Sequence, residues 1–476
     1  MSFLNYYSLQ NKRLLAIEKV IAFLIIYIPF EPFLLKFASD GIYPFLKYFA
    51  EILILILFFA VLSEHFLKKD KFIKTPIDTP LAAFIAITFV SSILNRTNLS
   101  LWILGLRQIF RYVLLYYAII YSRLSKETAK KFIVLLFLVL LAQSIIGIGQ
   151  AFIGKRADDF LLPGIKREFA GVISPSYVYQ FWSSGQRIFS TMGRYDRLGT
   201  FICFALILAI GFLYEIKDLR HKKKLIALMI LPIVVLILTY SRMSWLGFIL
   251  ALIFMSAVIR RDKKFILFFT VAILFLSVYL FIHAKTNDLK VKSIEDKASM
   301  TLASRFLSLF SLQELETSYN GYGRLYFIIN TPKKVVMKYP FLGAGLGQYG
   351  SGVAYALQNK KIYNELGLPF GIEGAQGQID NNWMSLWGET GSFGLLAFIG
   401  IVLSLFLYAL KSYRTIDDDF VKGVIIGFSG IILAVSFQAF LGPYFEIRTL
   451  SFYFWFLAGT AVVLVKIEKE KIGLQV

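Results

Sequence analysis

Apolar runs long enough to cross a lipid bilayer recur along the whole chain, and they constrain its fold more than any other feature. A transmembrane helix needs about 17 to 25 apolar residues to cross roughly 30 Å of hydrocarbon. Twelve such runs lie near residues 15–37, 43–62, 77–94, 100–121, 131–153, 198–216, 224–240, 243–259, 264–284, 387–410, 420–441 and 448–466. Hydrophobic residues make up 57% of the 476 residues, against roughly 45–50% in soluble domains. The sequence therefore predicts an all-α integral membrane protein with about twelve transmembrane helices, and residues 1–476 are expected to form one polytopic membrane domain.

The distribution of basic residues predicts the orientation. Lys and Arg collect on the cytoplasmic side of membrane proteins. With the N-terminus inside, the inner segments hold 25 Lys and Arg, whereas the four short outer connections hold only Arg96, Arg242 and Arg448. An even number of spans with both termini in the cytoplasm satisfies every loop. The formal net charge of +21 then reflects topology and contact with anionic lipids, and no nucleic-acid partner is expected.

Two predicted outer segments, residues 154–197 and 285–386, are much longer than the other connections. Loops of this length are usually functional or disordered. The second contains helix-like stretches such as "RLYFIINTPKKVVMKYP", and residues 285–381 hold 11 Lys and Arg against 8 Asp and Glu. We expect it to form a large helical extracytoplasmic cap that modestly favours an anionic ligand.

Cysteine and histidine are scarce. Cys203 is the single cysteine, which excludes an internal disulfide, and the three histidines His65, His221 and His283 are far apart in sequence. Neither a metal site nor another cofactor is expected from this composition.

Several arginines lie at predicted outer helix ends. Arg242, in "TYSRMSWLG", begins a span on the outer side, against the positive-inside bias. A helix N-terminus with an added guanidinium is a good phosphate site, and snorkelling to lipid headgroups is the alternative. Arg194 and Arg197, in "MGRYDRLG", could bind phosphate or a sugar acid, or could anchor their helix to lipid headgroups. Arg324 begins an amphipathic helix that is predicted to end before Pro340.

Two further groups are candidate substrate contacts. Arg107 and Arg111 lie one turn apart inside the fourth span, where charged residues are functional candidates, although Glu51 of the second span could pair with either. Gly345 and Gly347, in "PFLGAGLGQYG", permit a tight turn with close backbone approach, but they lack the lysine of a P-loop.

The stretch "DNNWMSLWGETG" places polar residues where the cap enters a span. If a helix starts just after Asp380, then Asn381, Ser385 and Glu389 share one face at spacing i, i+4 and i+8. One interpretation makes Asp380 the N-cap of that helix, with the polar stripe packed against another helix. The other interpretation brings carboxylate, amide and arginine groups together at the outer end of a transmembrane helix.

Three motifs, "TYSRMSWLG", "GRLYFIINTPKKVVMKYPFLGAGLGQYG" and "DNNWMSLWGETGSFGLLAF", together resemble the O-antigen ligase and O-antigen polymerase superfamily. Its members transfer glycan chains from undecaprenyl pyrophosphate to a sugar acceptor at the outer face of the bacterial inner membrane, without nucleotide sugar or metal. The resemblance implies a GT-C-like membrane fold. It also implies a lipid-linked glycan donor, a glycan acceptor and membrane lipids as partners, and it leaves open a chain-length regulator.

The resemblance also suggests roles for residues. Arg242 and Arg324 match the arginines that meet the pyrophosphate, and Asp380 with Asn381 occupies the active-site pair. Ligases of the superfamily usually carry His-Asn there and polymerases often carry Asp-Asn, so an inverting, metal-independent polymerase is favoured over a ligase. A lipid-linked saccharide transporter or flippase is the alternative from another class, but it would be expected to place broken helices and charged groups at the midplane.

Overall fold

Helices of up to 34 residues dominate the architecture. The computed structural model describes residues 3–163, 168–169, 172–173, 186–264, 267, 316, 319–370, 377–471 and 473. In chain order the elements are α1 (Phe3–Leu34), η1 (Leu35–Phe37), α2 (Tyr43–Leu67), α3 (Asp78–Leu94), α4 (Leu99–Ile109), α5 (Val113–Tyr121), α6 (Lys126–Ile153), α7 (Lys155–Leu161), β1 (Glu168–Phe169), β2 (Val172–Ile173), η2 (Ser190–Met192), α8 (Tyr195–Glu215), α9 (Leu219–Leu238), α10 (Arg242–Ile253), η3 (Phe254–Arg260), α15 (Arg324–Asn330), η5 (Thr331–Val336), α16 (Gly352–Ala356), α17 (Lys361–Leu366), α18 (Asn382–Thr415), α19 (Asp419–Gln438) and α20 (Arg448–Lys471).

Eight of the described helices are long and apolar enough to cross a membrane, and α4 with α5, bent by 63°, forms either a ninth, broken span or a re-entrant loop. The run predicted at 77–94 is the 17-residue helix α3, and the run at 224–240 lies mostly within α9, whose first turns are basic. The run predicted at 264–284 lies almost wholly outside the described residues. The structure thus confirms a multi-pass membrane protein built from helices, and its only described strands are the two-residue antiparallel pair β1–β2. The count of twelve spans stays a prediction.

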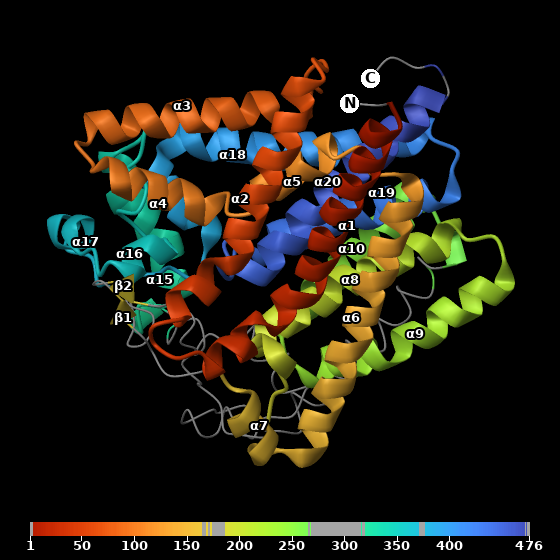
Figure 1. Ribbon diagram of the computed structural model, residues 1–476. Helices are drawn as coiled ribbons and strands as arrows, with labels where there is room; N and C mark the ends of the chain where they lie inside the picture. The colour runs from red at the N-terminus through yellow and green to blue at the C-terminus, as the bar shows by residue number, and fades with distance from the viewer. Residues whose placement is uncertain are drawn as a thin grey trace.

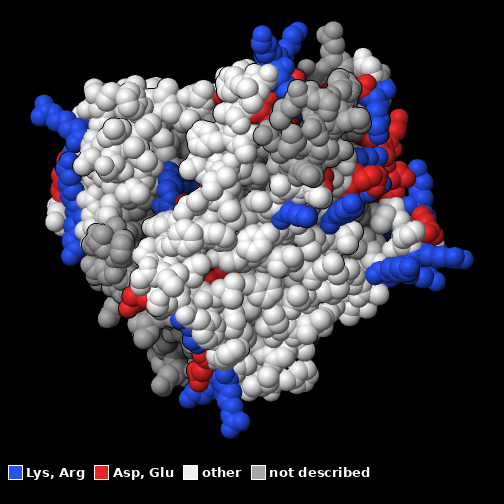
Figure 2. Space-filling model, in the orientation of Figure 1, with Lys and Arg blue, Asp and Glu red and all other residues white. Residues whose placement is uncertain are grey.

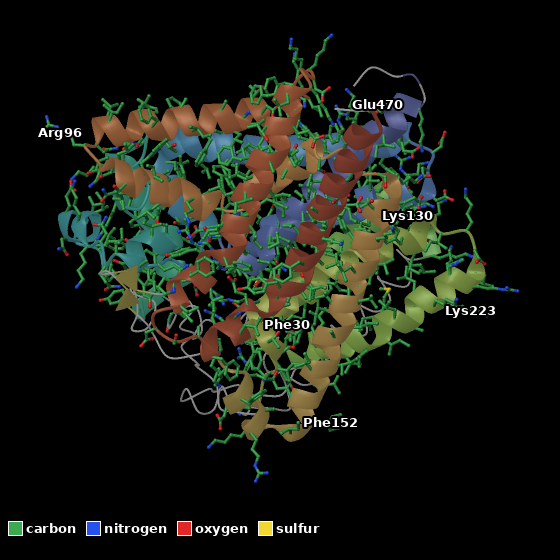
Figure 3. All side chains as sticks on the ribbon, in the orientation of Figure 1. Phe30, Arg96, Lys130, Phe152, Lys223 and Glu470 are labelled. Atoms are coloured by element: carbon green, nitrogen blue, oxygen red, sulfur yellow. The ribbon has the colours of Figure 1, made fainter. Side chains whose placement is uncertain are left out.

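The ends of the bundle differ in their charged groups. The start of α1 and the end of α20 lie at the same end of the bundle (Figure 1). Lys130 and Glu470 mark that end, and Arg96 and Phe152 lie far from it (Figure 3). Charged side chains gather toward the margins of the visible face, with a broad, largely uncharged surface between them (Figure 2). This distribution fits a membrane-embedded belt with both termini on one side.

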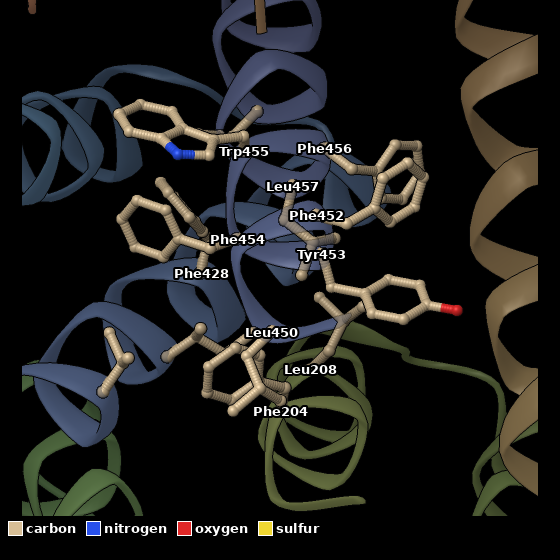
Figure 4. Close-up of a cluster of buried hydrophobic side chains, with 14 of the residues drawn as sticks. Phe204, Leu208, Phe428, Leu450, Phe452, Tyr453, Phe454, Trp455, Phe456 and Leu457 are labelled. Atoms are coloured by element: carbon tan, nitrogen blue, oxygen red, sulfur yellow. The ribbon is translucent and has the colours of Figure 1, made fainter. Parts of the chain in front are cut away.

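The core is built around α8, α19 and α20. Aromatic and aliphatic side chains from these three helices pack together, including Phe204, Phe428 and Phe452 (Figure 4). A methyl group added at Gly211 would lie 2.4 Å from the carbonyl oxygen of Gly423, so α8 and α19 can approach closely only because small residues meet there. The core therefore holds α8 closely against α19 and α20.

Short helices and strands connect the spans at the end of the bundle opposite the start of α1 and the end of α20 (Figure 1). The segment 154–197 contains α7, β1, β2 and η2, and the described part of 285–386 contains α15, η5, α16 and α17. The helix predicted from Arg324 does begin there, continues through η5 and ends before Pro340, as expected. Most of residues 285–318 lies outside the described part of the chain, so the full extent of the cap stays a prediction.

Candidate active site

Asp380 and Arg324 meet at the entrance to α18. Asp380 directly precedes the N-cap of α18, and Arg324 is the first residue of α15. Arg324 Nη2 lies 3.3 Å from Asp380 Oδ2, with the two side chains 37% and 41% exposed. This ion pair joins two segments that are 56 residues apart, and its exposure leaves both groups accessible to a ligand.

Arg194 lies in the same electrostatic environment. It is the N-cap residue of α8, and its Nε lies 3.0 Å from Asp196 Oδ1. Asp196 raises the pKa of Arg194 above its ordinary value against the effect of burial, and Asp380 adds to the rise. Partial desolvation lowers the pKa of the 37% exposed Arg324, but Asp380, Tyr444 and Tyr195 outweigh it and hold that pKa above its usual range. Both arginines therefore remain cationic, Arg194 beside Asp196 and Arg324 beside Asp380.

Arg197 and Arg242 occupy the adjoining helix ends. Arg197 lies in the first turn of α8, half-buried and within electrostatic range of Arg194 and Arg448. Arg242 opens α10 and is half-buried. The first turn of α10 packs on α8, since Ser244 Oγ lies 3.2 Å from Thr200 Oγ1. The structure thus packs the first turn of α10 against the second turn of α8, while an anion site shared by Arg242 and the arginines of α8 stays a prediction.

The N-cap of α18 is Asn381, which corrects the interpretation of Asp380 as the cap. Asn381 Oδ1 accepts a hydrogen bond of 3.0 Å from the Met384 N–H, the arrangement that defines an N-cap side chain. Asn381 is fully buried, and its Nδ2 has no hydrogen-bond partner within the described chain. Asp380 is therefore left outside the capping role, with its carboxylate directed to Arg324.

Glu389, Gly345 and Gly347 lie behind the entrance, in a buried clamp on α18. The Gly345 N–H donates to the Glu389 carbonyl at 2.9 Å, and the Tyr349 N–H donates to Glu389 Oε1 at 3.2 Å. Gly345 and Gly347 have φ of +100° and +75°, which glycine adopts without steric penalty. The loop encloses the 1% exposed Glu389, so these three residues lie beneath the Asp380–Arg324 pair.

Arg107 belongs to a partly buried ionic network. Its Nε and Nη2 donate to the two carboxylate oxygens of Glu51 at 2.6 and 2.9 Å. Arg448 donates to Glu51 at 2.9 Å and to Glu31 at 2.6 Å. The pairing of Arg107 with Glu51 was one of the alternatives open from the sequence. The link from Glu31 through Arg448 was not foreseen, because its members lie 417 residues apart.

Glu446 connects this network to the entrance of α18 through Gln108, which accepts a hydrogen bond from Arg111, an ion-pair partner of Glu51. Its carboxylate accepts hydrogen bonds from Asn382 Nδ2 at 3.0 Å, Gln108 Nε2 at 3.1 Å and the Gly352 N–H at 3.3 Å. Burial raises the pKa of Glu446 above its ordinary value, although the hydrogen bonds oppose that rise. The sequence analysis also missed Glu446. A single Glu before a span gives no indication that it will bind three partners on three different segments.

The described residues include no group of three His, Cys, Asp or Glu side chains that could hold a metal ion. Their cationic groups point instead to an anionic ligand. Arg324, Arg194, Arg197 and Arg242 all lie at or near helix N-termini, where backbone N–H groups add to the positive potential.

The fold and site together define a polytopic membrane protein with a basic site that carries one accessible carboxylate. Residues 227–399 match the family model described as O-antigen ligase. This match supports the O-antigen ligase and polymerase superfamily for the chain and confirms the resemblance predicted from the motifs. It points to a membrane enzyme of the ligase or glycosyltransferase type that acts on glycans. The matched segment includes Arg242, Arg324 and Asp380. No curated protein matches the chain.

Proposed function

We propose that the chain is an extracytoplasmic glycan polymerase of the bacterial inner membrane. It transfers an oligosaccharide from undecaprenyl pyrophosphate to a hydroxyl of a glycan acceptor. The observation that carries the proposal is the contact between Arg324 and Asp380 at 3.3 Å, with Arg194 close enough to interact electrostatically with both. Transfer from a pyrophosphate needs cations for the leaving group and a base for the hydroxyl, and this site supplies both.

The reaction is a single displacement. The acceptor oxygen bonds to the anomeric carbon while the bond from that carbon to the pyrophosphate oxygen breaks. Asp380 accepts the hydroxyl proton, which contributes on the order of 10² to 10⁴ in rate. Arg324 and Arg242 stabilise the charge that grows on the departing lipid pyrophosphate, with Arg194 and Arg197 beside them. Attack from the side opposite the leaving group inverts the anomeric configuration.

The remaining predicted residues support this site from within the protein. Asn381 sets the direction in which α18 leaves the entrance, because its side chain caps the helix. Glu389, with Gly345 and Gly347, holds the loop against the break in α18 at Gly391. Arg107 lies farther along the ionic network and would meet the donor only if Glu51 released it.

A ligase is the second candidate function, because the matching family model is described as O-antigen ligase. The reaction is the same, but the acceptor is then a lipid A-core sugar or another terminal acceptor. The Asp-Asn pair at Asp380 and Asn381 favours the polymerase, since ligases of the superfamily usually carry His-Asn. A transporter or flippase would move the lipid-linked glycan without forming a new glycosidic bond.

Reconstitution separates these functions. The purified chain is placed in liposomes with one defined undecaprenyl pyrophosphate-linked repeat and a lipid A-core acceptor, and products are read by mass spectrometry. A polymerase yields a ladder spaced by whole repeats with the new linkage inverted by NMR, whereas a ligase adds one donor chain to a lipid A-core acceptor. Lys338→Gln, an exposed cap residue paired with Glu365, serves as the active control. Movement of intact donor across the bilayer without any glycan product would overturn the enzyme proposal in favour of a flippase.

A further inference from the structure

A groove runs between α1 and α6 at the end of the bundle that carries the termini, remote from the candidate active site. It has a volume of about 520 Å³. Lys130, one of its lining residues, lies toward the same end of the bundle as Glu470 in Figure 3. The groove therefore opens where the positive-inside rule places the cytoplasmic membrane surface.

The groove has an apolar wall and a basic rim. Ala22 of α1 and Val134, Leu135 and Leu138 of α6 line the wall. The side chains of Val134 and Leu138 are 57% and 56% exposed. Lysines 19, 130 and 131 line the rim. An amphiphile with an anionic head and an apolar chain matches this division.

The acidic residues of the groove are already engaged. Glu18 Oε1 accepts a hydrogen bond of 2.7 Å from the Thr128 hydroxyl, which ties α1 to α6. Glu127 Oε1 accepts from Lys130 Nζ at 2.9 Å. Within the described chain, Lys19 and Lys131 have no hydrogen bond or ion pair. The rim thus presents two ammonium groups that an anion can bridge.

We propose that this groove binds one anionic phospholipid of the cytoplasmic leaflet. Its phosphate lies between Lys19 and Lys131, and an acyl chain follows Val134 and Leu138 along α6. Basic grooves between transmembrane helices on the cytoplasmic side attract anionic headgroups, at about 1 kcal/mol for each Lys near the surface. Loss of both lysines should accordingly weaken binding about 30-fold. The inference is independent of the reaction proposed for the other end of the bundle.

The test uses the full chain, delipidated in a neutral detergent. Binding of phosphatidylglycerol and of phosphatidylcholine with the same acyl chains is measured by native mass spectrometry. The Lys19→Gln/Lys131→Gln variant is compared with Lys223→Gln/Lys224→Gln, which removes the same charge from exposed residues of α9 outside the groove. We expect a preference for phosphatidylglycerol that the first variant loses about 30-fold and the second keeps.

A third variant, Lys19→Arg/Lys131→Arg, retains both charges and should retain the preference, which separates loss of the site from loss of the fold. Inorganic phosphate is added in a parallel arm and should not displace the phospholipid, because it has no chain for the apolar wall. The proposal is overturned if phosphatidylcholine binds as tightly as phosphatidylglycerol. Equal loss in both glutamine variants, or displacement by millimolar phosphate alone, overturns it as well.

Discussion

Catalysis by Asp380 can be separated from helix capping, because Asn381 caps α18. Asp380→Asn removes the base and keeps the size of the side chain. The ion pair that it weakens is partly exposed, and such pairs contribute about 0–1 kcal/mol to stability. We therefore expect the free energy of unfolding to fall by less than about 1 kcal/mol, while the initial rate of repeat transfer falls at least about 100-fold. Thermal unfolding in detergent and transfer from a lipid-linked repeat in liposomes measure the two effects.

Asn381→Ala is the matched control. It removes the hydrogen bond from the Met384 N–H, so stability should fall by about 1 kcal/mol or more. Asp380→Ala, by contrast, should resemble Asp380→Asn in both stability and rate. An Asp380→Asn enzyme that keeps its activity within threefold of the native chain would refute the base assignment. Destabilisation of Asp380→Ala to the same degree as Asn381→Ala would refute the separation of the two roles.

Three further predictions concern topology, the buried acid and the helix break. A cysteine at position 380 should react with an impermeant thiol reagent added outside the cell, and a cysteine at 223 should not; the reverse pattern contradicts the proposed orientation. Glu446→Ala leaves the Gly352 N–H and the Asn382 amide unpaired, so unfolding measurements should show a loss of about 1–3 kcal/mol, and no loss would mean water replaces the carboxylate. Gly391→Ala puts a side chain on a residue with φ of 64° and places its Cβ 2.4 Å from the Gly343 nitrogen. We therefore expect the free energy of unfolding to fall by at least about 1–3 kcal/mol. Native stability would contradict the clamp.

The sequence predicted those features that depend on local pattern. Span length and charge asymmetry indicated the multi-pass helical fold, and the amphipathic period placed the helix that starts at Arg324. The polar stripe of Asn381, Ser385 and Glu389 is indeed buried on α18. Gly345 and Gly347 were expected to permit a tight turn, and both adopt positive φ in the structure. Apart from the charge asymmetry, each of these signals lies within one short segment of the chain, where periodicity and backbone preference act.

The sequence could not show which distant groups meet. The contacts of Arg448 with Glu31 and Glu51 depend on how α20 packs beside α1 and α2, and a single sequence contains no record of that packing. Asp380 and Asn381 illustrate the same limit at short range. Both residue types are good N-caps, and only the backbone shows that α18 begins one residue later than a cap at Asp380 requires.

A structure of the full chain with an undecaprenyl pyrophosphate-linked repeat tests the central claim most directly. The account predicts that pyrophosphate oxygens lie within hydrogen-bonding distance, about 3 Å, of the guanidinium groups of Arg324 and Arg242. The anomeric carbon should then face Asp380 across the space for an acceptor hydroxyl. A donor whose pyrophosphate lies away from both arginines, or whose anomeric carbon cannot be approached from Asp380, would contradict it.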